Sequence, residues 1–299
     1  MVGSTVPRRA FGRYLRGLRE QAGVTLMSAG LEIDTSKQTI LRMEDGQPTK
    51  VSTPQLKTLL DRYRVRPEVR AEALQLWDEV RQQAKAAQLQ GTYKGWWQAY
   101  ADQYAPHFDH YLRLEDSANR MTTHQLVLVH GLLQTPDYRR AIIQASIPDI
   151  SPTDLDRRLE VAAHRQERLT ETGFRFEALL SEAVPRHLPG GPAVMIGQLR
   201  RLIEIGEQDN ISIRIVPFAA GMHGGLVALS FTLLEFPPLA SRLVEPPVAY
   251  IDGSEGALYL EHADALARFR RAITDMRHVA LDEDDTRDLM VALIKEYSA

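Results

Sequence analysis

The sequence predicts an α-helical N-terminal domain followed by a larger α+β domain with a small, mostly antiparallel sheet. Apolar residues recur at helical spacing through roughly the first 90 positions, whereas short alternating runs begin after Gly173. Charge also divides the chain, because residues 1–66 carry 12 Lys and Arg against 6 Asp and Glu, and the remainder carries 24 against 33. A basic head on an acidic remainder favours a nucleic-acid-binding domain joined to a domain with another role.

Two short helices joined by a tight turn are predicted near the N-terminus. Thr25 is a suitable N-cap for a helix over residues 26–33. Asp34 lies in the turn, where Asp tolerates the left-handed backbone region better than most residues. The second helix spans residues 37–44 and ends at Gly46, where we expect a left-handed C-cap.

The second of these helices is predicted to have one buried face and one free face. Ile40 and Met43 are three residues apart, so they share the buried face. The free face carries Lys37, Gln38, Leu41 and Arg42. A short helix with basic and amide side chains on its free face, held by another helix across a tight turn, is typical of a helix-turn-helix DNA reader.

Three further helices are expected around this motif, one before it and two after it. Their apolar stripes are Phe11, Leu15 and Leu18; Leu56, Leu59 and Leu60; and Val69, Ala73, Leu76 and Val80. The last helix, over residues 67–91, is long and polar on one side, and we interpret it as an arm between the two domains. Because a single apolar stripe must be covered, a dimer helix is the alternative.

The N-terminal segment resembles the helix-turn-helix domain of Xre-type, phage repressor-like regulators. The resemblance rests on the stretch GRYLRGLREQAG, on Ser36, Thr39, Ile40, Arg42, Glu44 and Gly46, and on residues 51–65. It implies that Lys37 and Gln38 read base edges, that Leu41 touches a thymine methyl, and that Arg42 serves guanine or phosphate. The expected DNA-binding residues are Thr25, Ser36, Lys37, Gln38, Thr39, Leu41, Arg42, Lys50 and Lys57.

The second domain, residues 92–299, is predicted to mix helices and strands. Expected strands are FRFEALLS, ISIRIVPF, LVALSFTLLEF, VAYID and GALYLE, and DHYLRLED is a short strand or helix. Helices are expected after the cap Thr135, after Ser151 or Thr153, over residues 193–206, and in two C-terminal segments, the last capped by Asp284 or Asp285.

The second domain also resembles a family domain, the uncharacterised one that follows an Xre-type head in many actinobacterial regulators. The stretches that carry this resemblance are WWQAY, GLLQTPDYRRA, RRLEVAAHRQERL, GGPAVMIGQLRRLIE, IRIVPFAAGMHGG, FTLLEF and GALYLE. WhiJ-like and antitoxin-like regulators belong to this group. The resemblance implies a transcription factor that is often paired with a small protein encoded beside it.

Two features of the second domain are candidate ligand or partner sites. Trp96, Trp97 and Tyr100 belong to an aromatic cluster that either lines a pocket or anchors helices to the core. His223 lies in a glycine-rich loop. The glycines either let the backbone approach a ligand that His223 contacts, or they only allow the chain to turn. We keep all four residues as candidates beside the structural interpretation.

Enzyme chemistry is not expected. The chain has no cysteines, which excludes disulfides and thiolate sites. His107 and His110 with Asp109 are the nearest approach to a metal site, but no third ligand is fixed by their spacing. Nothing combines a nucleophile, a base and an orienting group. We therefore predict no catalytic residues, no metal and no cofactor.

The sequence therefore predicts a sequence-specific transcriptional regulator with a DNA-binding domain over residues 1–66. It is expected to bind double-stranded DNA as a homodimer, because one short recognition helix reads only a half-site. Dimerisation is expected to lie in the second domain, residues 92–299. A small acidic partner protein encoded nearby or a small-molecule effector would act through the second domain. No membrane span or signal core is recognised, so a cytoplasmic location is expected. The alternatives are an antitoxin-like protein that mainly holds a partner, and a small-molecule sensor or cryptic enzyme.

Overall fold

The structure, a computed structural model, describes residues 6–89, 96–238, 245–253 and 256–299. The chain divides into two compact units. The first, here the helical unit, comprises residues 1–99, 108–117 and 236–246. The second, here the sheet unit, comprises residues 100–107, 118–235 and 247–299. None of the helices in the described residues is long and apolar enough to cross a membrane.

The head of the helical unit consists of five α-helices in the predicted order. They are α1 (Val6–Gln21), α2 (Leu26–Glu32), α3 (Lys37–Glu44), α4 (Thr53–Arg62) and α5 (Pro67–Leu89). The 3-10 helix η1 (Trp96–Tyr100) and α6 (Pro106–Ser117) follow. The stretch DHYLRLED, which the sequence predicted as either a strand or a helix, lies within α6 and is therefore helical.

The head has one apolar core, and α5 is part of it. Phe11 and Leu15 of α1, Ile40 of α3 and Leu76 of α5 are almost fully buried in the same cluster. Phe11 also packs on Trp77, with ring centroids 5.1 Å apart. The apolar stripe of α5, for which the sequence offered a dimer helix as the alternative, is covered by α1 of the same chain.

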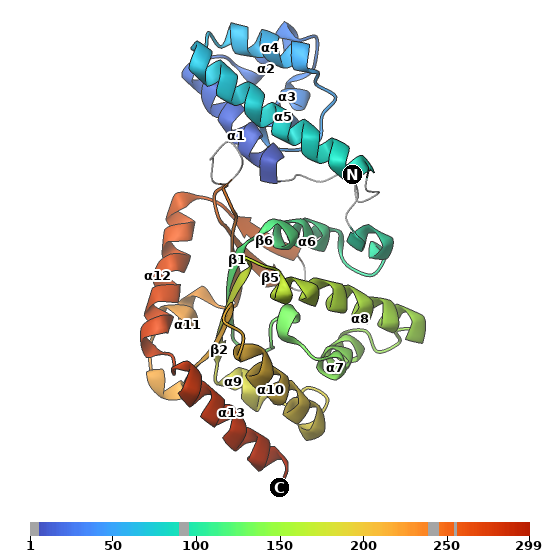
Figure 1. Cartoon of the computed structure of the whole chain (residues 1–299), viewed down its shortest axis with the longest axis vertical. Helices are drawn as coiled ribbons and strands as arrows, with labels where there is room; N and C mark the ends of the chain where they lie inside the picture. Colours follow the sequence, from blue (N-terminus) through green and yellow to red (C-terminus); the bar gives the residue numbers. More distant parts are fainter. Residues whose placement is uncertain (1–5, 90–95, 239–244, 254–255) are drawn as a thin grey trace. The chain divides into compact units, whose positions relative to one another are not determined.

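The sheet unit has a six-stranded sheet with helices on both faces (Figure 1). The strands are β1 (Arg120–Gln125), β2 (Arg175–Ser181), β3 (Ile211–Val216), β4 (Phe231–Glu235), β5 (Val248–Gly253) and β6 (Gly256–Leu260). The α-helices are α7 (Pro136–Ser146), α8 (Pro152–Gln166), α9 (Ala183–Arg186), α10 (Pro192–Gly206), α11 (Gly224–Ala228), α12 (Ala263–Val279) and α13 (Glu283–Tyr297). The short 3-10 helices are η2 (Gly131–Leu133), η3 (Glu167–Thr170) and η4 (Phe218–Ala220).

The strand order in this sheet is β3-β2-β1-β4-β5-β6. The β1–β2 and β2–β3 pairs are parallel, whereas the other three pairs are antiparallel, which confirms the predicted α+β class. In Figure 1, α11 and α12 lie on one side of the sheet and α7, α8 and α10 on the other. The α12 side is closed by an apolar cluster that includes Leu179, Phe231 and Phe269.

The central strand β1 was not predicted, and its composition explains why. Its sequence, RMTTHQ, has no alternating apolar residues, although most of it is buried. Two of its buried polar side chains pair inside the sheet instead. Thr123 Oγ1 donates to the Phe231 carbonyl at 3.1 Å, and His124 Nδ1 lies 2.8 Å from the Leu179 carbonyl. Buried strands that pair their polar side chains in this way escape a search for alternation.

Two other predictions for the sheet unit are corrected. The stretch LVALSFTLLEF does not form one strand, because residues 224–228 are the short helix α11 and only residues 231–235 form β4. The last helix is capped by Asp282, whose carboxylate accepts from the Asp285 amide at 2.8 Å, rather than by Asp284 or Asp285.

Candidate nucleic-acid interface

Side-chain caps set the positions of α2 and α3. Thr25 Oγ1 accepts from the Ser28 amide at 3.1 Å, and Ser36 Oγ accepts from the Thr39 amide at 3.2 Å. Between the two helices, Asp34 has φ +52°, the left-handed conformation expected for the turn. Thr25 and Ser36 therefore act as N-caps, and the Thr25 hydroxyl still has its own proton for a phosphate oxygen.

The face of α3 that the sequence assigned to DNA is free in the structure. Lys37, Gln38 and Arg42 are exposed, whereas Ile40 and Met43 are buried in the head core. Leu41 is half-buried, and Thr39 Oγ1 lies 3.1 Å from Ser36 Oγ. Within the described residues, Lys37 and Gln38 have no hydrogen-bond or ion-pair partner, so both side chains are available to a ligand.

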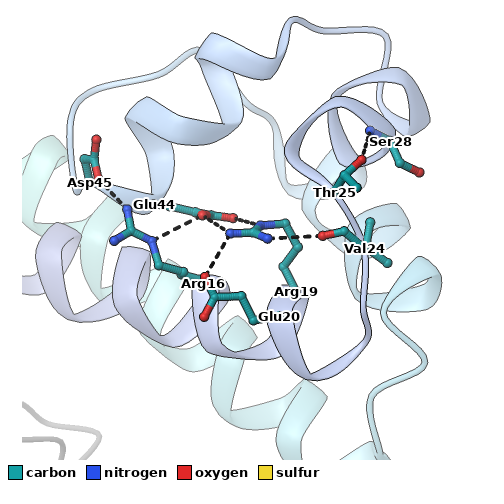
Figure 2. Close-up of polar contacts among 8 residues, drawn as sticks. All are labelled: Arg16, Arg19, Glu20, Val24, Thr25, Ser28, Glu44 and Asp45. Atoms are coloured by element: carbon teal, nitrogen blue, oxygen red, sulfur yellow. Dashed lines mark hydrogen bonds and ion pairs between the residues drawn. The ribbon is translucent and has the colours of Figure 1, made fainter.

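A buried ion pair holds the C-terminal end of α3 against α1 (Figure 2). Glu44 is 1% exposed, and its two carboxylate oxygens accept from Arg19 Nε at 2.7 Å and Nη2 at 2.9 Å. The same guanidinium donates to the Val24 carbonyl at 3.1 Å. Hydrogen bonding to Glu44 raises the pKa of Arg19. The bidentate pair fixes α3 relative to both α1 and the α1–α2 turn.

A second arginine of α1 strengthens the same junction. Arg16 donates to Glu44 at 3.4 Å and to the Asp45 carboxylate beyond the end of α3 (Figure 2). Gly46 follows at φ +69°, the expected left-handed C-cap. The sequence placed Glu44 in the family motif without a physical role. An acidic residue in the buried stripe of a helix was the signal that it needed a basic partner.

The two lysines expected to contact phosphate are both exposed. Lys50 lies in the α3–α4 connection, and Lys57 lies on α4. The start of α4 is fixed by a capping box between Ser52 and Gln55, and Gln55 Nε2 also donates to the Ile33 carbonyl at 2.9 Å. The described residues include no hydrogen-bond or ion-pair partner for either lysine, so both charges are free for phosphate.

Polar and aromatic partners surround the two candidate tryptophans. Trp97 is buried and donates from Nε1 to Asp109 Oδ1 at 2.9 Å, and Trp96 meets its ring edge-on. Arg113 pairs with the same Asp109 and lies 5.8 Å from the Trp97 ring centroid. These contacts give both tryptophans a structural role in the helical unit. Their role in ligand binding stays a prediction.

Tyr100 belongs to the sheet unit. A hydrogen bond to Glu160 raises the pKa of its phenol, and Arg157 lies 5.7 Å from its ring centroid. Arg157 also donates to Asp102, which lowers the pKa of that exposed carboxyl to about 2. Since Trp96 and Trp97 belong to the helical unit, the predicted aromatic cluster is divided between the two units.

His223 is the N-cap of α11. Its Nδ1 accepts from the Gly225 amide at 3.2 Å, and desolvation lowers its pKa. Its ring centroid lies 6.3 Å from that of His124, a fully buried residue that the sequence did not single out. Burial lowers the pKa of His124 as well. The two rings are therefore neutral near pH 7, and His223 has an evident structural task in addition to its candidate role.

Comparisons with known families give one match in each half of the chain. Residues 10–73 match a family model described as a helix-turn-helix domain. Residues 108–291, more than half of the chain, match a model described as a domain of unknown function, DUF5753. The two matches in this order fit an Xre-like helix-turn-helix regulator. Neither the curated proteins nor the solved structures provided a match.

Proposed function

The chain belongs to the DUF5753 family, and from this premise and its helix-turn-helix domain we propose that it is a sequence-specific DNA-binding transcriptional regulator. The observation that carries the proposal is the free face of α3. Lys37, Gln38 and Arg42 are exposed on a short helix, whereas the opposite face of that helix is locked into the head core. A rigid helix with exposed amide and basic side chains is suited to the major groove.

Affinity in this proposal comes from positive charges around the reading helix. Lys50 and Lys57 are exposed and supply sequence-independent contacts to phosphate, while the hydroxyls of Thr25 and Ser36 donate to phosphate oxygens. Gln38 and Lys37 read base edges, since they open the helix. The contacts to phosphate position the protein, and the contacts to bases select the site.

The protein acts, in this proposal, as a homodimer that binds two half-sites. It belongs to the group of actinobacterial WhiJ-like regulators, and a small acidic partner protein or a metabolite controls it through the second domain. It works by binding rather than by catalysis. The sequence resemblance supports these finer statements, and the half-site argument supports the dimer.

Selection from a random DNA library tests the proposal. The full-length protein is expected to enrich one motif made of two related half-sites about 10–10.5 base pairs apart, or a multiple of that spacing. A matched selection with Lys57→Ala, which changes only a phosphate contact, should enrich the same motif from fewer bound molecules. Bound DNA with no enriched motif would contradict sequence-specific regulation.

A further inference from the structure

The connection between β3 and β4 exposes an unusual number of large apolar side chains. Five of them lie within residues 218–229, here the 218–229 segment, which includes η4 and α11. Their exposed fractions are 62% for Phe218, 77% for Met222, 46% for Leu226, 72% for Val227 and 58% for Leu229. Isolated exposed apolar residues are normal, but a contiguous group of this kind marks an interaction surface.

The exposure follows from how α11 lies on α12 (Figure 1). A side chain at Gly224 would come within 2.8 Å of the Ala272 Cα, and one at Gly225 would collide with Met276 Sδ. The inward side of α11 therefore consists of glycines, so the helix backbone sits directly on α12. The large apolar residues of the helix are left on the outward side, opposite to the usual arrangement of a surface helix.

Several polar contacts fix the 218–229 segment in this orientation. The Phe218 amide donates to Glu182 Oε2 at 2.8 Å, and His223 caps α11. Leu229, which has a Cβ, adopts φ +60° at the end of the helix. A left-handed leucine persists only where its surroundings hold it. The apolar side chains are thus presented on a structured surface.

The exposed surface extends to a second connection of the sheet unit. The Leu126 amide donates to Ser230 Oγ at 3.1 Å, which joins the residues after β1 to the end of the 218–229 segment. Val127 and Leu128 follow at 53% and 36% exposure. We name these two residues and the five exposed residues of the 218–229 segment the apolar patch.

The chemistry of the apolar patch favours a partner with an equally uncharged surface. Residues 216–230 contain no Asp, Glu, Lys or Arg, although a quarter of the whole chain is charged. With exposed fractions from 36% to 77%, the patch is on the order of 600 Å², against about 800 Å² that each partner buries in a standard interface. Residues 216–230 meet their own copy across a two-fold axis without like-charge repulsion among themselves. The charged groups beside them, Glu182 at the Phe218 amide and Asp275 near Gly224, belong to neighbouring elements.

We propose that the apolar patch is the surface through which two copies of this chain associate. The choice of a second copy as the occupant rests on the proposed function, because a reader of two half-sites needs two heads. A small acidic partner protein would find no complementary positive charge within residues 216–230. The dimer forms through the sheet unit and uses no residue of α3.

Sedimentation equilibrium of the full-length protein without DNA tests this proposal. The variants are Val227→Asp and Met222→Asp, which place like charges in the interface. The control is Val291→Asp, which changes an exposed valine on α13 of the same unit. Wild type and control should be dimers with equal dissociation constants, and each patch variant should weaken the dimer by about 100-fold or more. Unchanged far-ultraviolet circular dichroism verifies folding of each variant.

A monomeric wild type at tens of micromolar, or patch variants that dimerise as well as the control, would overturn the assignment. Binding to a single half-site duplex separates this failure from failure of the proposed function. If Val227→Asp binds that duplex as the wild type does but loses the gain from a second half-site, both proposals stand. A patch-dependent dimer that selects no DNA would leave the interface intact and overturn the regulator.

Discussion

The apolar stripe of α5 and the 218–229 segment are both rich in apolar residues, and the sequence does not identify what covers either of them. In the structure the first is buried and the second is exposed. Leu76 of α5 is fully buried against the head, although the sequence pattern left the stripe free for a second copy. Leu226 and Val227, which the alternating pattern assigned to a strand, are exposed on α11. The sequence offered two surfaces for association, the long helix and the second domain, and the one on α5 is covered by α1 of the same chain.

This contrast shows what apolar periodicity does and does not report. A repeat of apolar residues establishes that one face of an element avoids water, but the neighbouring elements decide what covers that face. For α5 the neighbour is α1 of the same chain. For α11 the glycines at positions 224 and 225 seat the backbone itself on α12, so the side chains are left uncovered.

The largest effect is expected where the head is closed by a buried charge pair. Glu44→Ala should destabilise the helical unit by about 3–5 kcal/mol, because it leaves Arg19 buried without its counter-charge. Urea unfolding followed by circular dichroism measures the change. The control is Glu32→Ala, which removes only an exposed pair with Arg62 and should cost less than about 1 kcal/mol. Equal losses from the two variants would mean that the buried pair does not secure α3.

The comparison itself is tested by truncating one leucine from each apolar run. Leu76→Ala should cost about 2–5 kcal/mol, since it leaves a cavity in the head core. Leu226→Ala should change the free energy of unfolding by less than about 0.5 kcal/mol, measured at a protein concentration low enough to keep the chain monomeric. If the two variants reversed this order, the assignment of buried and exposed runs would be wrong.

The parts of the fold that the sequence predicts are those set by local chemistry. Caps such as Ser36 and the turn at Asp34 are determined by residues within one helical turn, so α2 and α3 were located within a residue or two. The strand β1 depends on partners more than 50 positions away, and its buried threonines and His124 carry no local signal.

The candidate nucleic-acid interface also has a part that the sequence predicts and a part that only the fold reveals. The free face of α3 follows from the helical spacing of Ile40 and Met43, so its residues were named from the sequence alone. The pairing of Arg19 with Glu44 joins two helices that are distant in the sequence, and only the folded head reveals it. The outward face of α11 was missed because exposed apolar residues have the same pattern as a buried strand.

Affinities on selected and random DNA at several salt concentrations test the central claim most directly. Gln38→Ala should relax preference at one or two base pairs and cost roughly 1–3 kcal/mol on the selected site. Lys50→Ala should weaken binding equally on both DNAs and reduce the salt slope by about one. These results would establish α3 as the base reader and the α3–α4 connection as a phosphate contact. Unchanged discrimination for Gln38→Ala, together with its loss for Lys50→Ala, would contradict the account.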